Sequence, residues 1–348
     1  MPVEFLEKNS DWPTSDWPTL HPLSAFPRLN AHCPRWHRAV AKGLCHTPYL
    51  LVHRNDAGVP EGLLPLHFVK SLAFGKFLVS LPYVNTGGVW ARDESIAREL
   101  ISAACDLADR LDVRYLELRH EKPVDHPRLN RQRTDKVHMR LPLPGSLDEL
   151  NRSFKSKLRS QLKKIAGQPF EISWGKQPLL ADFYSIFARN MRDLGTPVVS
   201  RRLFECILSE FPDGAELGVV KLEGNPLAGA LLVHQHAVTE VPSASSLRAY
   251  NATGVNMWMY HQLLARAIDK GSSTFDFGRS SKDSNTYRFK EQWNAVPYPS
   301  VWQYYVRRGS ANDMRPESST NQSLIRIWKR LPVWLTRWIG PPIVRGIP

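Results

Sequence analysis

Apolar residues recur every three to four positions in several parts of the chain, a spacing that predicts amphipathic helices. In the clearest case, Ile96, Leu100 and Leu107 fall on one stripe. Asp93 stands just before this stripe, where its carboxylate can accept hydrogen bonds from the first turn. The same period predicts further helices at residues 35–43, 146–166, 180–194, 201–211 and 256–270.

Short apolar runs bounded by turn residues separate these helices and predict strands. The runs cover residues 49–54, 63–71, 77–84, 113–119, 137–143, 170–174, 216–222, 227–241, 274–278 and 301–306. Helices and strands alternate in both halves, which predicts a mixed α/β (α+β) class with sheets flanked by helices. Because the order of elements largely repeats after Pro142–Gly145, we predict two related domains, residues 1–145 and 146–312, and a tail at 313–348.

Composition places the chain among ordinary folded proteins, since 42% of its 348 residues are hydrophobic and 23% are charged. The first twenty residues carry acidic side chains and no apolar run before a cleavage site, so no signal peptide is expected. No apolar stretch reaches the ~20 residues that a membrane-spanning helix needs. The scattered cysteines form no C-x-x-C pair, which favours reduced thiols. These features predict a cytoplasmic protein without a disulfide scaffold or a cysteine-rich zinc module.

Charge adds one constraint on partners. Lysine and arginine number 46 against 33 acidic residues, a formal net charge of +13 that favours nucleic acid, phosphorylated metabolites or anionic lipid. Within the predicted helix 146–166, Arg152, Arg159 and Lys163 belong to a cationic stripe beside the apolar one. This stripe is either a solvated face or a surface that meets phosphates, and the pattern leaves both interpretations open.

Most standard catalytic motifs are missing. The chain has no G-x-S-x-G, G-x-x-x-x-G-K-[ST], H-E-x-x-H or G-x-G-x-x-G sequence, which argues against serine hydrolases, P-loop NTPases, zincins and Rossmann enzymes. His234 and His236 point the same way on a strand, but no third ligand has useful spacing. We therefore expect no metal.

The richest polar stretch follows a predicted buried strand. Residues 275–280 read Phe-Asp-Phe-Gly-Arg-Ser, and residues 287–293 place Lys290 among bulky aromatic side chains. Strand ends in α/β sheets tend to line binding crevices, and Gly278 lets the backbone turn sharply. Partial desolvation would strengthen the field of Lys290 on a developing oxyanion. We interpret this stretch as a candidate site rather than an Asp–Arg pair that only fixes the strand end.

At these residues the sequence resembles a known family. The resemblance spans residues 20–310, and the segments that carry it are 81–89, 159–166, 191–197, 224–241, 256–271, 275–280 and 289–290. Together they resemble the FemAB-like proteins of the GNAT-fold acyltransferase superfamily. The branch most similar is the one associated with exosortase/PEP-CTERM and exopolysaccharide systems, with a CelD/BioF-type acetyltransferase-like domain. The resemblance implies tandem GNAT-like domains.

The resemblance also implies a reaction and residue roles. In this family an aminoacyl or acyl group passes to an amine, and Lys290 after Phe289 matches the F-K motif whose lysine stabilises the transition state. Two departures are Asn294 where a glycine usually follows the next aromatic, and the absence of an acetyl-CoA pyrophosphate loop of the Q-x-x-G-x-G/A type.

We assign the remaining roles by chemistry. Asp276 or Glu240 would accept the proton of the amine. Arg248 and Arg279 would hold an anionic substrate group through forked hydrogen bonds. The other candidate substrate-binding residues are Arg159, Tyr250, Asn256, Ser280, Tyr287 and Phe289.

The sequence thus predicts an N-acyltransferase that acts on a phosphorylated cell-envelope or exopolysaccharide precursor. No bound cofactor is expected, and the acyl donor would be aminoacyl-tRNA or acyl-CoA. One alternative is a non-catalytic assembly factor of such a system that keeps the GNAT fold. Another is a nucleic-acid-binding module, although no RNA-binding motif supports it.

The tail differs in composition from the rest. Trp328, Trp334 and Trp338 stand among cations, and no acidic residue follows Glu317. Tryptophan beside lysine and arginine favours the headgroup zone of an anionic bilayer. Residues 322–348 would then place the protein peripherally on the inner membrane. The alternative is that the tryptophans pack back on the domains.

Overall fold

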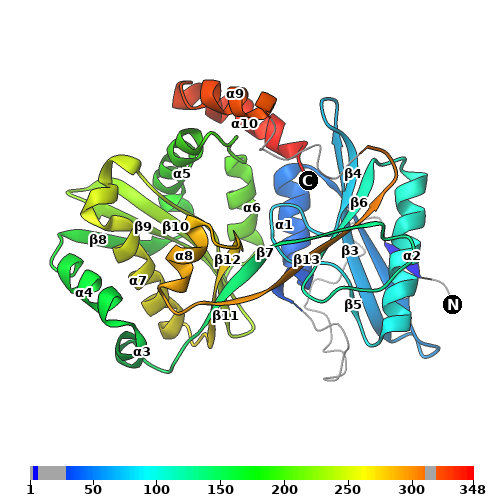
Figure 1. The fold of residues 1–348 in the computed structure, drawn as a ribbon, viewed down its shortest axis with the longest axis horizontal. Coiled ribbons are helices and arrows are strands. Elements are labelled where there is room, and N and C mark those ends of the chain that lie inside the picture. The colour runs from blue at the N-terminus through cyan, green and yellow to red at the C-terminus, as the bar shows by residue number, and fades with distance from the viewer. Residues whose placement is uncertain (1–2, 7–28, 310–318) are drawn as a thin grey trace. The chain divides into compact units, whose positions relative to one another are not determined.

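The computed structural model describes residues 3–6, 29–309 and 319–348. Contacts divide the chain into two units, one with residues 1–136, 299–317 and 342–348 and the other with 137–298 and 318–341 (Figure 1). This division differs from the linear one expected from sequence. Strands β7 (Arg131–Pro142) and β13 (Val296–Val306) each have residues in both units, so no single cut along the chain separates them.

The first unit has a mixed sheet with the strand order β1-β2-β3-β4-β6-β13, and β5 pairs with β3. Its strands are β1 (Glu4–Leu6), β2 (Thr47–Arg54), β3 (Pro60–Ser71), β4 (Gly75–Val79), β5 (Trp90–Ala91), β6 (Tyr115–His120) and part of β13. Strands β4 and β6 run parallel, whereas β13 is antiparallel to β6. The short helix η2 (Asn30–His32) precedes α1 (Pro34–Leu44), and α1 and α2 (Glu94–Arg110) lie on opposite sides of the strands (Figure 1).

Helix α2 forms as its sequence predicts. The Asp93 carboxylate accepts a hydrogen bond from the Ile96 amide at 3.0 Å and caps the first turn. Ile96 and Leu100 are buried in the core that α2 makes with the sheet. Gly62 on β3 permits this close approach, because a Cβ at that position would lie 2.6 Å from Ile96 Cγ2.

The second unit has the strand order β7-β12-β11-β10-β9-β8, in which β11 and β12 are parallel. Its strands are β8 (Phe170–Gly175), β9 (Ala215–Leu222), β10 (Asn225–Gln235), β11 (Val238–Ser246), β12 (Thr274–Ser281) and the second part of β7. Its helices are α3 (Leu147–Ser153), α4 (Ser156–Ile165), η3 (Gln177–Leu179), α5 (Leu180–Leu194), α6 (Arg201–Glu210), η4 (Arg248–Thr253), α7 (Val255–Asp269), α8 (Asn285–Glu291), α9 (Ser319–Trp328) and the first part of α10 (Val333–Arg345).

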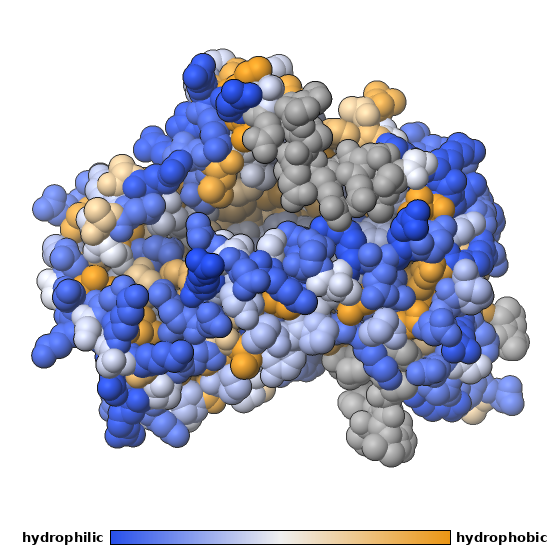
Figure 2. All heavy atoms as spheres, viewed as in Figure 1, coloured by the Kyte–Doolittle hydropathy of each residue, from blue (hydrophilic) through white to orange (hydrophobic). Residues whose placement is uncertain are grey.

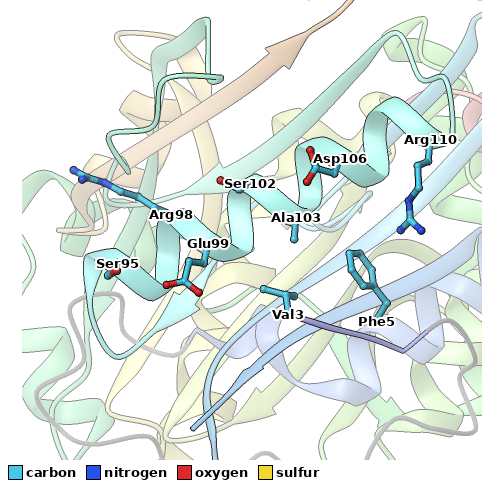
Figure 3. Close-up of a pocket in the computed structure, with 9 residues that line it drawn as sticks. All are labelled: Val3, Phe5, Ser95, Arg98, Glu99, Ser102, Ala103, Asp106 and Arg110. Atoms are coloured by element: carbon cyan, nitrogen blue, oxygen red, sulfur yellow. The ribbon is translucent and has the colours of Figure 1, made fainter. Parts of the chain in front are cut away.

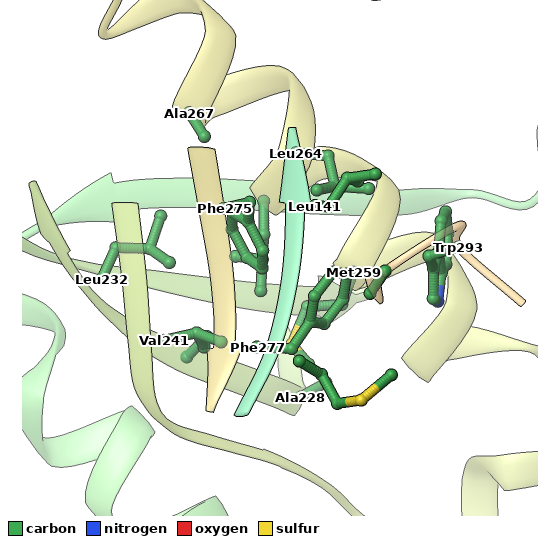
Figure 4. Close-up of a cluster of buried hydrophobic side chains, with 14 of the residues drawn as sticks. Leu141, Ala228, Leu232, Val241, Met259, Leu264, Ala267, Phe275, Phe277 and Trp293 are labelled. Atoms are coloured by element: carbon green, nitrogen blue, oxygen red, sulfur yellow. The ribbon is translucent and has the colours of Figure 1, made fainter. Parts of the chain in front are cut away.

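Helices cover both faces of this second sheet. Helix α7 buries Met259 and Leu264 against strand residues such as Phe275 and Phe277, and Trp293 closes the same core (Figure 4). Helices α5 and α6 lie on the other side of the sheet (Figure 1). The mixed α/β class with sheets flanked by helices is therefore confirmed.

Three predicted elements differ from the observed ones. The helix predicted at 146–166 is two helices, because Phe154 takes an extended backbone and buries its ring against Trp293. The run at 227–241 is a hairpin of β10 and β11 that turns at His236–Ala237, where both φ angles are positive. The strand predicted at 77–84 ends at Val79. Helix α8, which carries Lys290, was not predicted from the sequence.

Candidate active site

Strand β12 sends aromatic and polar side chains to opposite faces of the second sheet. Phe275 and Phe277 are buried in the α7 core (Figure 4). Asp276, between them, therefore points to the other face. Its Oδ1 accepts a hydrogen bond from the Gly278 amide at 2.7 Å, and Gly278 has a φ of +75° that favours glycine. The Asp-x-Gly sequence thus shapes the chain directly beside a buried carboxylate.

Lys290 is held over the end of this strand by helix α8. The helix starts at Ser284, whose Oγ accepts a hydrogen bond from the Tyr287 amide at 3.2 Å. The Lys290 side chain is buried, and its Nζ donates to the carbonyl oxygens of Gly278 at 3.0 Å and Arg279 at 3.1 Å. Burial lowers the pKa of Lys290 to about 8, although the negative charge of Asp276 acts in the opposite direction.

Two carboxylates and an arginine lie side by side across three strands. Glu240 on β11 is the direct register partner of Asp276, so the two side chains emerge on the same face. Arg140 on β7 donates from Nε to Asp276 Oδ2 at 2.9 Å, and its guanidinium also lies 5.2 Å from the ring centre of Tyr298. Both oxygens of Asp276 therefore already accept hydrogen bonds.

Sequence reasoning did not single out Arg140. The signal was present, because residues 137–141 alternate apolar and polar side chains and so predict a strand with one polar face. Val137, Met139 and Leu141 do enter the core, whereas Arg140 reaches Asp276. Which strand would lie beside β12 depends on long-range pairing, and this pairing is not visible in the local pattern.

The structure brings together only part of the predicted site. Lys290, Asp276 and the Arg279 backbone form one cluster. Ser280 follows on β12 and is buried, and its Oγ has no hydrogen-bond partner among the described residues. This hydroxyl is a polar atom that a bound group or water could satisfy.

The other predicted residues lie around the second core or on the surface. Tyr250, Tyr287 and Phe289 pack against the core, and Phe289 contacts Tyr260 with ring centres 4.9 Å apart. Asn256 is in the first turn of α7. Arg248 in η4 and Arg159 in α4 are exposed, and within the described chain no polar contact joins either to Lys290. The whole cationic stripe on α3 and α4 is exposed.

The two histidines considered for a metal have other partners. His234 contacts Thr239 Oγ1 at 2.8 Å and Glu216 Oε1 at 3.0 Å, and Arg266 binds the same carboxylate through two hydrogen bonds of 2.7 Å. These partners hold the pKa of Glu216 at about 2 against the opposing effect of burial. Across residues 3–6, 29–309 and 319–348, no group of three or more His, Cys, Asp or Glu side chains is arranged to hold a metal.

A groove in the first unit offers no comparable chemistry. It has a volume of about 520 Å³ and lies between β1 and α2 (Figure 3). Phe5 lies under the guanidinium of Arg110, with 4.9 Å between the ring centre and Cζ. None of the lining residues has a buried polar side-chain atom without a partner. We therefore place the candidate active site at Lys290.

Comparisons with known proteins bear on the same part of the chain. Residues 152–291, which include Lys290, match the family model described as Acetyltransferase (GNAT) domain. This portion of the chain is therefore similar to GNAT domains. A search of curated protein sequences found no significant match.

Solved structures extend the likeness to most of the chain. A structure described as FemX has a TM-score of 0.60 at 16% identity and covers 94% of this chain and 100% of its own. A conserved protein of unknown function from Bacteroides thetaiotaomicron has a TM-score of 0.50 at 12% identity, covering 78% and 92%. A tandem GNAT protein from the clavulanic acid biosynthesis pathway has a TM-score of 0.49 at 12% identity, covering 80% and 90%. Together with the family match, the likeness to FemX shows a GNAT-like fold, and a shared fold gives neither the activity nor the substrate.

Proposed function

We propose that this protein is a FemAB-like N-acyltransferase. It would transfer an aminoacyl or acyl group from an activated ester or thioester to an amine of a phosphorylated cell-envelope or exopolysaccharide precursor. The observation that carries the proposal is the geometry of Lys290. A protonated lysine has three N–H donors, and two of them are bound to the carbonyls of Gly278 and Arg279. The third has no partner among the described residues and is available to a developing oxyanion.

The proposed reaction needs no covalent enzyme intermediate. The acceptor nitrogen attacks the donor carbonyl carbon, the new N–C bond forms, and the C–O or C–S bond to the donor breaks. The remaining Lys290 N–H stabilises the oxyanion, which is worth several kcal/mol in a desolvated site. Glu240 or Asp276 takes the proton that the amine loses. Because both Asp276 oxygens already accept hydrogen bonds, we favour Glu240 as the acceptor and Asp276 as the charge that faces Lys290.

Binding of the substrates is assigned by charge. Arg279 and Arg248 would bind an anionic group of the acceptor, and Ser280 would donate or accept one hydrogen bond at the strand end. Arg159 and the neighbouring exposed cations of α3 and α4 would face donor phosphates, whether of aminoacyl-tRNA or of acyl-CoA. The resemblance to the exosortase/PEP-CTERM branch favours an envelope precursor, handled in the cytoplasm at the inner membrane.

A non-catalytic assembly factor with the same fold is the competing proposal. Burying a lysine without need is costly, since desolvation disfavours its charged form. The buried Lys290 with an available N–H therefore favours an enzyme over a scaffold.

Mass spectrometry of envelope precursors tests the reaction directly. Extracts of cells with and without the protein are compared for a mass increase that corresponds to an added acyl or aminoacyl group. Cells carrying only Lys290→Met should lack the increase, because one lost oxyanion donor costs about 10²-fold or more in rate. Lys282→Met is the matched control, since Lys282 is exposed just beyond β12. A folded, fully active Lys290→Met protein would refute the role of Lys290. Precursors that never change would favour the assembly factor.

A further inference from the structure

The last two helices are fixed to the second unit by their inner face. Ile325 and Lys329 lie against Gly195, where an added Cβ would be 2.5 Å from Ile325 Cγ2. The Leu331 carbonyl accepts a hydrogen bond from Arg192 Nη1 at 2.9 Å. Gly340 contacts the Val198 backbone, and Thr336 is buried. This part of the chain is therefore not a loose tail.

Four large apolar side chains of the same two helices are exposed. Trp334 and Trp338, one helical turn apart on α10, are 70% and 75% exposed. Leu324 and Ile327 on α9 are each 59% exposed. We call these four residues the outer face of α9 and α10. Trp334 and Trp338 do not pack back on the unit. The alternative that the tail packs on the domains therefore holds only for the inner face.

The charge around the outer face has one sign. Residues 318–348 contain five arginines and lysines and no acidic residue. Arg326 and Arg330 are exposed close in sequence to these apolar side chains. Lys329 and Arg337 are also exposed, although Lys329 reaches Gly195 and the Arg337 guanidinium lies 5.1 Å from the ring centre of Tyr184. Apolar and strongly hydrophilic atoms lie next to each other at the top of the molecule in Figure 2, where Figure 1 places α9. The Asp193 carboxylate is paired at 2.7 Å with Arg192, the residue that donates to the Leu331 carbonyl.

We infer that the outer face of α9 and α10 docks on an anionic lipid bilayer. Tryptophan rings with flanking cations suit the headgroup region, where the indoles enter the acyl boundary and the cations meet lipid phosphates. In the described part of the chain, no helix is long and apolar enough to cross a bilayer. Short helices with exposed tryptophans can instead bind at the surface of the bilayer. A protein partner has less support, because the exposed cations of α9 and α10 have no acidic side chain beside them in residues 319–341, and this composition suits an anionic lipid surface.

Docking needs no substrate, so its test is independent of the proposed reaction. The full-length protein is sedimented with vesicles of phosphatidylcholine alone and with vesicles that also contain phosphatidylglycerol. We expect binding only to the second kind, weaker as salt is added. Trp334→Ala/Trp338→Ala should lower partitioning about tenfold or more by removing two indoles from the interface. Arg326→Glu/Arg330→Glu should lower it about 25-fold or more, since each cation contributes about fivefold.

Matched variants separate this surface from general effects. Lys270→Glu/Lys282→Glu makes the same change of net charge at exposed positions elsewhere in the second unit and should keep binding. Leu72→Ala removes a fully exposed apolar side chain from the first unit and should also keep it. Unchanged binding by the tryptophan variant, equal binding to both vesicles, or no binding by the wild type would each overturn the inference. So would sedimentation equilibrium in which the tryptophan variant converts a dimer to a monomer, because the face would then bind a second copy.

Discussion

Lys290 can act as an oxyanion donor only while it is protonated. Burial brings its pKa down to about 8, so its charge is lost as the pH rises through that value. The acceptor amine has the opposite need, because it must be unprotonated to attack. The two requirements together predict a bell-shaped rate profile.

With acceptor amines whose pKa lies below 8, we therefore expect kcat/KM of the wild type to fall as the pH rises above about 8. Steady-state rates of acyl transfer between pH 6 and 10 measure this limb, with amine acceptors of different basicity to move the rising limb alone. Lys290→Arg, which keeps its charge at every pH used, should lose the falling limb even if its rate is low. A falling limb that persists in Lys290→Arg would assign it to another group.

The residues of the site differ in how far sequence could predict them. Lys290, Asp276 and Arg279 lie within fifteen positions, so local chain geometry was enough to bring them together. Arg140 is 136 positions from Asp276 and joins it only because β7 lies beside β12. Arg248 was predicted from its charge, and Arg159 from its charge and its place in a segment that resembles the family. Charge does not specify distance, and among the described residues no polar contact joins either to Lys290.

At the scale of elements, the period of the apolar residues predicted which helices and strands exist better than it predicted where they begin and end. The stripe from Leu150 to Leu162 runs through the break at Phe154, because α3 and α4 bury their apolar sides in the same core. No glycine or proline marks this break. The β10–β11 hairpin was missed for a similar reason: its turn at His236–Ala237 lacks the glycine that usually signals positive φ.

Helix α10 depends on a small residue at one contact. A Cβ at Gly340 would lie 2.9 Å from the Val198 amide nitrogen and 3.1 Å from its carbonyl oxygen, and backbone atoms cannot rotate away. We expect Gly340→Ala to destabilise the docked helix by about 1–3 kcal/mol, despite the better helix propensity of alanine. Limited proteolysis should cut the variant faster between residues 319 and 341. Gly145→Ala, with open space around its Cβ, is the control and should be cut at the wild-type rate.

At the scale of the whole molecule, the order of the strands could not be predicted from the local sequence pattern. Strand β13 pairs with β6 although Val301 and His120 are 181 positions apart, and the helices between them give no sign of it. The buried histidines of the first unit are a second property that only the fold creates. His37, His46, His67 and His120 are all buried, and His37 Nδ1 lies 2.9 Å from His67 Nε2.

Burial keeps these histidines neutral in the folded protein. It lowers the pKa of His37 to about 3 and those of His46 and His120 to about 4, against about 6.5 in an unfolded chain. Between pH 6.5 and about 4 the unfolded state therefore binds more protons, and the free energy of unfolding falls as the pH falls. Above pH 6.5 the histidines contribute no pH dependence.

Acid should therefore weaken the first unit well before its carboxylates titrate. For His120 alone, we expect a loss of about 1–2 kcal/mol in the free energy of unfolding between pH 7 and pH 5. Urea unfolding followed by tryptophan fluorescence at several pH values measures the total slope. His120→Asn keeps a polar group beside Gln303, which His120 Nδ1 contacts at 3.0 Å, and should make the slope shallower whatever its effect on stability at pH 7. His236→Asn, at an exposed turn, should leave the slope unchanged. If His120→Asn and the wild type lose stability in parallel, His120 is not among the groups that take up protons on unfolding.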